Sequence, residues 1–178
     1  MSKNDFIHAD SGLVDPHGEY YIRVNDGPEE IISNRIPTQG FNYLLSVGLK
    51  AGAAQPSWYL ALFSGGYTPT DEVTAATFAN VATEIVSSTN GYTETTRQAW
   101  TPGDVANSEV SNLATEAVFT IATTSSVTVR GVALLSSPVK GGTDGVLMSI
   151  ARFPQDRTYY DGDKVTIGYR VRMRPFQA

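Results

Sequence analysis

The two histidines are the residues of this sequence best suited to acid–base or metal chemistry. His8 and His17 lie nine residues apart, in a stretch without a helical period that would bring their rings together. Catalysis by a Ser-His-Asp or Cys-His site needs a histidine beside the nucleophile, so these two would serve only if the N-terminal stretch folded back. The chain has no Cys, which excludes a thiolate zinc site and a cysteine nucleophile. The sequence therefore predicts that the protein is not an enzyme.

Glycine-rich and acidic stretches offer further sites, each with a simpler interpretation. Residues 140–145 hold three glycines but precede no expected helix, which favours a hairpin turn over a phosphate-binding loop. Asp161-Gly-Asp163 lacks the other ligands of a calcium loop and favours a turn. Carboxylate pairs for glycoside hydrolysis are available among Glu84, Glu94, Asp104, Glu109 and Glu116. Any acidic protein offers such pairs, so they do not indicate catalysis. We expect no metal ion and no cofactor.

Charge is unevenly distributed along the chain. The formal net charge is −5; residues 1–140 carry 7 basic and 14 acidic side chains, whereas residues 141–178 carry 6 and 4. Arg170, Arg172 and Arg174 alternate with apolar residues, which places them on one face of a strand, ~6.6 Å apart. They form either a solvated or edge-protecting sheet face or a basic strip that binds an acidic surface on a partner. Direct nucleic-acid binding is disfavoured, because the protein is acidic and aromatic residues do not interleave with these arginines.

Aromatic residues occur both within apolar runs and at the ends of expected strands. Trp58 and Phe63 lie in one apolar run and are expected in the core. Tyr67, Tyr92 and Trp100 lie at strand ends or in loops, where rings stack on sugars, anchor an interface or cap a sandwich. The sequence leaves these alternatives open.

These residues must be positioned by a mostly β fold. Only 17% of the 178 residues are charged, which argues against a disordered chain or a long-helix protein. Alternating apolar residues and turn signals predict seven or eight strands, the clearest over residues 164–174. One short helix is expected after Pro37, with apolar residues at helical spacing: Phe41, Leu44, Leu45 and Leu49. The long spacers between the expected strands favour an all-β, jelly-roll-like antiparallel β-sandwich.

The N-terminal region is expected to lie outside that sandwich. Residues 1–17 show no period of two or 3.6, which indicates an extended arm. Apolar segments at 19–24 and 31–32 flank an Asn-Asp-Gly turn and predict a hairpin. We therefore expect an arm with a possible hairpin over residues 1–34 and a jelly-roll domain over residues 35–178. No segment has the length and apolarity of a Sec signal or a spanning helix, so we expect a protein made and kept in a cytoplasm.

Several short motifs occur in an order that is similar to a known family. They are Gly40-Phe-Asn-Tyr-Leu-Leu45, Trp58-Tyr-Leu-Ala-Leu-Phe63, Gly91-Tyr-Thr-Glu94, Thr96-Arg-Gln-Ala-Trp100, Ala117-Val-Phe-Thr-Ile121, Arg130-Gly-Val-Ala-Leu-Leu-Ser136 and Tyr160-Asp-Gly-Asp-Lys-Val165. In this order they resemble the small jelly-roll cement, or decoration, proteins of tailed-bacteriophage heads. The resemblance spans about residues 35–173 and rests on the order of the motifs, not on any one of them.

The resemblance implies a structural virion protein that is made in the host bacterial cytoplasm. Such a protein binds the outside of the assembled head and reinforces contacts between major capsid protein subunits. It usually acts as a symmetric dimer or trimer, and an extended terminus often reaches a neighbouring subunit. No membrane partner is implied.

Two regions are predicted to contact partners. One is the arm, through Phe6, Ile7, Leu13 and Val14, and the other is the arginine face of Arg170, Arg172 and Arg174. Two other classes of protein stay open at this point. One is a phage tail, fibre or baseplate adaptor module, and the other is a carbohydrate-binding β-sandwich module that uses the loop aromatics.

Overall fold

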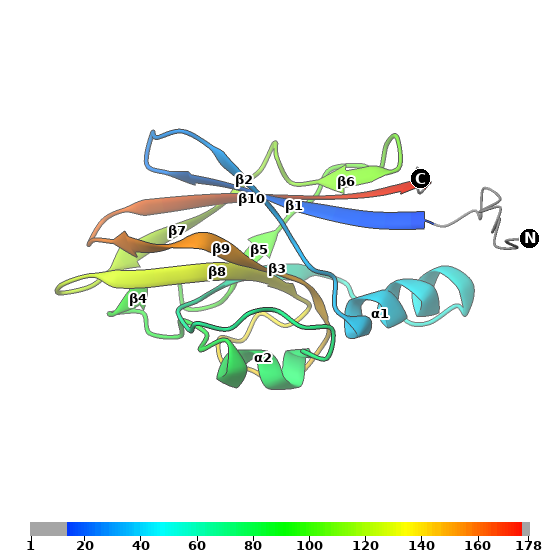
Figure 1. Cartoon of the computed structure of the whole chain (residues 1–178), viewed down its shortest axis with the longest axis horizontal. Coiled ribbons are helices and arrows are strands. Elements are labelled where there is room, and N and C mark those ends of the chain that lie inside the picture. The colour runs from blue at the N-terminus through cyan, green and yellow to red at the C-terminus, as the bar shows by residue number, and fades with distance from the viewer. Residues whose placement is uncertain (1–13, 176–178) are drawn as a thin grey trace, which may run out of the picture.

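The computed structural model describes residues 14–175, which fold into two antiparallel sheets (Figure 1). The elements within this range are β1 (Val14–Val24), β2 (Glu30–Ser33), α1 (Thr38–Leu49), β3 (Trp58–Phe63), α2 (Ala75–Val81), β4 (Gly91–Tyr92), β5 (Gln98–Trp100), β6 (Glu109–Ser111), β7 (Ala117–Ala122), β8 (Val127–Leu135), β9 (Leu147–Tyr159) and β10 (Lys164–Pro175). The larger sheet has the order β2-β1-β10-β7-β4, with β6 also paired to β10. The smaller sheet has the order β5-β3-β8-β9. The predicted all-β class with antiparallel pairing is confirmed.

The main core lies between the sheets and is built from side chains that alternate along the strands. The inward residues of β10 are fully buried, as a period of two predicts: Val165, Ile167 and Tyr169. Leu60 and Leu62 of β3 belong to the same cluster. Ala61 and Phe63 of that strand instead join a second cluster with Phe78 of α2. Both faces of β3 are therefore covered, which explains its unbroken apolar sequence.

The first strand corrects the expected division of the chain. β1 pairs with β10 along its whole length, beginning with Val14 opposite Pro175, and its Tyr20 is fully buried. Residues 14–34 thus belong to the larger sheet, and residue 34 does not separate an arm from the sandwich. The predicted hairpin is confirmed, because β2 pairs antiparallel with β1.

Proline and glycine hide the strand character of β1 in the sequence. Pro16 and Gly18 are poor strand residues, so this stretch resembles an arm when it is read alone. In the fold, Gly18 is required by its neighbours, since an added Cβ would lie 2.4 Å from the Tyr169 hydroxyl and 2.6 Å from Asn34 Oδ1. Continuous pairing with β10 overrides the local preference of the sequence.

The described residues contain two helices, whereas the sequence predicts one. α1 spans the expected range. α2 is a second, short helix whose Phe78 is fully buried in the cluster on the other side of β3. The Thr74 amide donates to Thr77 Oγ1 at 3.1 Å, and this local capping supports a helix too short to give a clear periodic signal.

The apolar alternation of residues 127–135 breaks near Gly131, which predicts a bulge, and a register shift between β8 and β9 lies there. Val129 pairs opposite Arg157, but Gly131 pairs opposite Arg152, so residues 153–156 of β9 protrude from the ladder. Gly131 also permits close packing, because an added Cβ would lie 2.1 Å from Phe63 Cζ. The bulge therefore shapes one exposed edge of the smaller sheet.

Candidate partner-binding surfaces

Arg170 and Arg172 of the predicted arginine strip lie on the outer face of the larger sheet, where their charges are already paired. Arg170 Nη2 lies 2.6 Å from Glu19 Oε2, and Arg172 Nε lies 2.6 Å from Glu109 Oε2. The two arginine side chains are only 17% and 22% exposed. Arg174 pairs opposite Asp15 in the backbone ladder, and its side chain lies outside the described residues.

The side chains around Glu19 favour the charged form of its carboxyl group. Partial burial raises its pKa, but hydrogen bonds from Arg170 and Tyr21 and the charges of Arg170 and Arg172 outweigh burial, so the net pKa is lowered. The Tyr21 hydroxyl donates to Glu19 Oε2 at 3.0 Å, and the Arg170 guanidinium lies 5.0 Å from the centre of the Tyr21 ring. These contacts, together with the pair of Arg172 and Glu109, neutralise the two described arginines of the strip within the molecule. Its role in binding an acidic partner stays a prediction.

The predicted arm falls only partly within the structure. Phe6, Ile7 and Leu13 lie outside the described residues, and of Val14 only the backbone is described. Val14 starts β1 opposite Pro175, so the chain enters the larger sheet at the end where β10 leaves it. Figure 1 shows α1 at this same end of the molecule.

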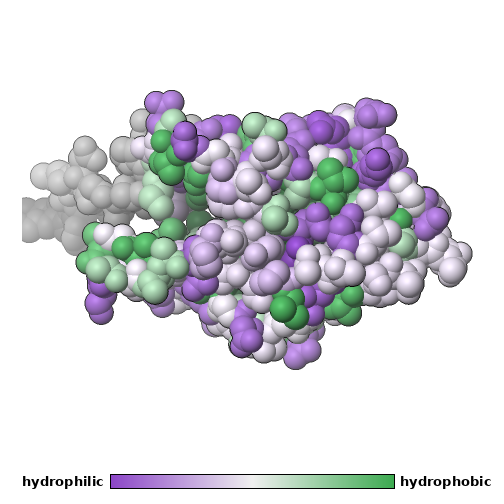
Figure 2. Space-filling view, turned by 180° about the vertical axis from the view of Figure 1, so that it is seen from behind, coloured by the Kyte–Doolittle hydropathy of each residue, from purple (hydrophilic) through white to green (hydrophobic). Residues whose placement is uncertain are grey.

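An exposed apolar stripe on α1 is the surface that sequence reasoning missed. Phe41, Leu45 and Leu49 are 38%, 56% and 80% exposed, and their spacing of four residues places them along one side of the helix. We call these three residues the α1 stripe. Figure 2 shows hydrophobic surface gathered over α1, at the left of the view. Of the four apolar residues that the sequence places at helical spacing in this helix, only Leu44 packs against the main core cluster.

The body of the protein holds α1 by its other side. Gly40 is buried against the Met148 carbonyl, which an added Cβ would approach to 2.6 Å. Gln39 Oε1 accepts hydrogen bonds from the Ala75 and Leu147 amides at 2.9 and 2.8 Å. Tyr43 packs edge-on against Trp58 with ring centres 5.2 Å apart. These contacts fix the orientation in which the stripe faces outward.

Two of the three loop aromatics are buried, which weakens the sugar-stacking alternative. Tyr92 is fully buried and packs edge-on against Phe119, while the Lys140 ammonium lies 3.4 Å from its ring centre. Trp100 is 9% exposed, and its Nε1 donates to the Tyr169 carbonyl at 3.2 Å. Rings covered in this way have no free face for a sugar, so they serve to close the ends of the core.

The carboxylates that the sequence offers for hydrolysis are mostly engaged in structural contacts. Glu84 forms a two-point ion pair with Arg97, with Nε–Oε1 and Nη2–Oε2 distances of 2.7 Å, and both side chains are fully buried. Glu116 pairs with Arg23 at 2.8 Å. Glu94 accepts from the Thr120 amide at 3.2 Å. Each of these three carboxylates is therefore held by a different contact within the fold.

The Asp161-Gly-Asp163 segment forms a turn between β9 and β10. Asp163 Oδ2 accepts from the Tyr160 amide at 2.8 Å, and Asp161 Oδ1 accepts from the Thr123 amide at 3.1 Å. The Tyr160 hydrogen bond, with a second from Asn25, lowers the pKa of Asp163. Throughout residues 14–175, no three His, Asp or Glu side chains gather as a metal ion would require.

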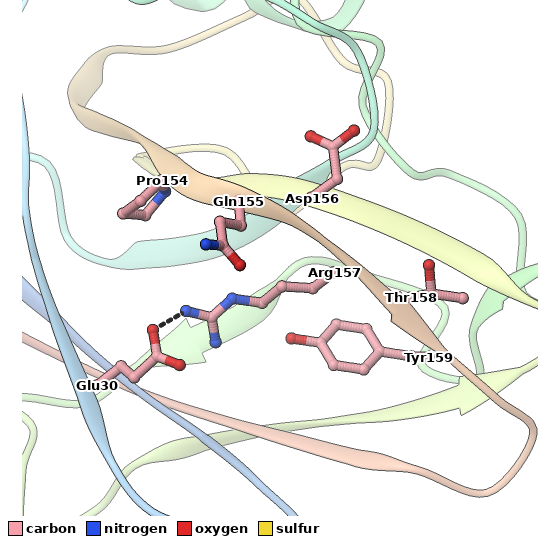
Figure 3. Close-up of a pocket in the computed structure, with 7 residues that line it drawn as sticks. All are labelled: Glu30, Pro154, Gln155, Asp156, Arg157, Thr158 and Tyr159. Carbon is pink, nitrogen blue, oxygen red and sulfur yellow. Dashed lines mark hydrogen bonds and ion pairs between the residues drawn. The ribbon is translucent and has the colours of Figure 1, made fainter.

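A polar groove of about 430 Å³ runs beside the bulged part of β9. Figure 3 shows Arg157 reaching across it to Glu30 of β2, with the Tyr159 ring alongside. The ion pair joins edge strands of the two sheets. Arg157 also lies over the Phe153 ring, 4.7 Å from its centre. The charges of Arg157 and Glu30 in this groove are thus paired with each other.

The sequence matches no known protein-family model and no curated protein. Among the residues that the structure describes, no helix is both long and apolar enough to cross a membrane.

Proposed function

We propose that this chain is a structural virion protein that binds the outside of an assembled phage head and reinforces contacts between major capsid protein subunits. The motif order that resembles jelly-roll cement proteins supports this proposal. The motifs fall on or beside α1 and β3, β4, β5, β7, β8 and β10, and these six strands belong to the two sheets. A jelly-roll arrangement of these sheets belongs to the same proposal.

The observation that carries the proposal is the apolar end of the molecule. The α1 stripe and the start of β1 lie at this end (Figure 1). Arginines elsewhere on the surface are paired with carboxylates of the same chain. A partner would therefore gain more from burying apolar side chains at this end than from pairing with charges. We assign this end to the shell contact, and we propose that the arm residues Phe6, Ile7, Leu13 and Val14 take part in that contact.

Binding of this kind reinforces a shell by mass action. A protein that binds the assembled lattice, and not its separate subunits, stabilises the lattice by its binding free energy. Repeated copies, or a dimer or trimer of this chain, would add avidity across neighbouring subunits. No direct contact with nucleic acid is part of this proposal, because Arg170 and Arg172 already carry carboxylate partners.

The proposal is tested by adding purified protein to heads that lack it and measuring bound copies after sedimentation. We expect saturable binding, and we expect deletion of residues 1–13 to weaken it at least tenfold. The deletion stops at residue 13 because β1 begins at Val14. A circular dichroism spectrum should show that the deleted chain keeps its fold.

Two matched double variants distinguish binding through the apolar side chains of residues 1–13 from a general effect of that segment. Phe6→Ser with Ile7→Ser should weaken binding nearly as much as the deletion, whereas Asn4→Ser with His8→Ser should leave it unchanged. Absence of saturable binding to heads would contradict the proposal. Binding to tails alone would favour the adaptor class, and binding to glycans would favour the carbohydrate class.

A further inference from the structure

The polar groove beside β9 contains a buried hydroxyl that the fold does not use. The Tyr159 side chain is only 4% exposed, and its hydroxyl has no hydrogen-bond partner among the described residues. Burial raises the pKa of Tyr159 against the opposing charge of Arg157, so the hydroxyl stays protonated and able to donate. Buried polar groups in folded proteins nearly always have a partner. The Tyr159 hydroxyl therefore marks a place where an acceptor would be stabilising.

The Arg157 guanidinium is a second donor in this groove that is used only in part. Its side chain is 16% exposed and lies over the Phe153 ring, which holds the cation in place. A guanidinium has five N–H donors, but within the described residues this one makes a single hydrogen bond, to Glu30. The Glu30 side chain is 59% exposed, so it is free to turn into the solvent. Arg157 thus keeps donors for another acceptor.

The two donors lie on the same side of β9. Figure 3 shows the Tyr159 hydroxyl directed toward Arg157, whereas Asp156 points to the other side of the strand. Asp156 is engaged there by Arg130, whose Nε lies 2.8 Å from Asp156 Oδ2. Of the two carboxylates that line the groove, only Glu30 therefore faces the donors, and it contacts just one of them.

From these contacts we propose that the groove is a carboxylate-binding site, in which a ligand carboxylate replaces Glu30 on Arg157 and also accepts a hydrogen bond from the Tyr159 hydroxyl. The guanidinium fork matches a planar carboxylate with two parallel hydrogen bonds. Glu30 is an internal stand-in, which occupies Arg157 in the free protein and turns to the solvent when the ligand binds. The groove lies away from α1 (Figure 1), so the site does not depend on the proposed shell contact.

The size and charge of the groove favour a small carboxylate group over a larger anion. A volume of about 430 Å³ is in the range of small-ligand sites. The displaced Glu30 and the nearby Asp156 would repel a phosphate dianion more than a carboxylate with a single charge. A free organic acid and an acidic side chain of a peptide present the same planar group, so the experiment compares these two sources.

The test is an NMR titration of the isotope-labelled full chain at constant pH and ionic strength. Glutarate is the free acid, and acetyl-Gly-Glu-Gly-amide is the peptide. Glutaramide and acetyl-Gly-Gln-Gly-amide are neutral controls of the same shape. We expect both charged probes to cause saturable shifts of the backbone amides of residues 155–159, and the neutral probes to cause none. The charged probe that binds more tightly identifies the source of the carboxylate.

Three substitutions test the role given to each side chain. Arg157→Gln should weaken glutarate binding about tenfold or more, because charged hydrogen bonds are lost. Tyr159→Phe should weaken it about threefold without lowering the thermal midpoint, because the hydroxyl has no partner in the free protein. Glu30→Gln should tighten binding about threefold, a gain that a damaged fold would not produce. As the matched control, Arg23→Gln removes an arginine that pairs with Glu116 outside the groove and should leave binding unchanged.

Four results would overturn the inference. Absence of saturable shifts, or equal shifts with charged and neutral probes, would mean that the groove does not recognise a carboxylate. The same shifts with chloride or phosphate would mean that it holds an adventitious ion only. Unchanged binding by Tyr159→Phe would remove the hydroxyl from the site. Weaker binding by Glu30→Gln would mean that Glu30 is not a stand-in for the ligand. None of these results bears on binding to heads, so the two proposals fail separately.

Discussion

Glu84 and Arg97 form a charged contact at the centre of three loops. Arg97 also donates to the Ser137 and Gly142 carbonyls at 3.0 and 3.2 Å, and the Gly141 amide donates to Glu84 Oε2 at 2.9 Å. The protein itself thus supplies the hydrogen-bond and ion-pair partners of both side chains. Such a pair fixes the turn over residues 137–142 against the segment that leads into β5.

Removing one charge of this pair should be strongly destabilising. We expect Glu84→Gln to lower the free energy of unfolding by about 3–5 kcal/mol, because Arg97 would be left buried without a counter-charge. Urea unfolding followed by circular dichroism measures the loss. Glu72→Gln, at an exposed position, should stay within about 0.5 kcal/mol of the parent. A loss below about 1 kcal/mol for Glu84→Gln would contradict this account of the pair.

Glu19 should give the stability of the protein a component that depends on pH. Its pKa is lowered in the fold, so its contribution is full above the unfolded pKa and is lost as the pH falls through the folded one. We expect Glu19→Gln to cost about 1 kcal/mol at pH 7 and less at an acidic pH, because the contribution of a carboxylate with a lowered pKa fades as the pH falls. Urea unfolding at both pH values tests this. An equal difference at the two pH values would show that charge is not the cause.

Sequence patterns locate the arginines of β10 but cannot find their partners. Alternation alone places Arg170 and Arg172 on one face. Glu19 and Glu109 lie 151 and 63 residues away in the chain from those arginines, and no local period links them. Only the pairing of β1 and β6 with β10 brings the charges together.

The elements differ in how clearly the sequence predicts them. β3 is evident because both of its faces are buried, which leaves an unbroken apolar run. β10 is evident because one of its faces is buried, which leaves an alternating apolar pattern. Pro16 and Gly18 hide β1 in the sequence, and they fit the sheet because β10 pairs opposite them. α1 is predicted with its bounds, but its apolar spacing does not say which side meets the body. Gly40 and Gln39 decide which side of α1 packs on the body, and neither residue is part of the apolar period of the helix.

Two glycines of α1 should respond oppositely to the same substitution. Gly48→Ala should raise the free energy of unfolding by about 0.5–1 kcal/mol, since its Cβ meets open space and alanine favours a helix. Gly40→Ala should lower the free energy of unfolding, because its Cβ would meet Met148 O at 2.6 Å and Ile36 Cγ2 at 2.9 Å. Thermal and urea unfolding of both variants measure this contrast. Two changes of the same sign would contradict the packing described for α1.

At the scale of the whole molecule, the pairing of surface charges predicts how shell binding responds to salt. Contacts through apolar side chains are little affected by screening, whereas contacts through free arginines weaken steeply. We expect the affinity for heads to change less than about threefold between ~50 and ~500 mM NaCl. A loss above about tenfold, abolished by Arg170→Ser with Arg172→Ser, would instead support the arginine strip as the contact.

The central claim is that this chain decorates the shell of a phage head. The most direct measurement is its copy number and position on purified virions, by quantitative mass spectrometry and cryo-electron microscopy. The account predicts hundreds of copies spread over the shell, with the end that carries α1 and the start of β1 against the capsid. A few copies confined to one vertex or to the tail would contradict it.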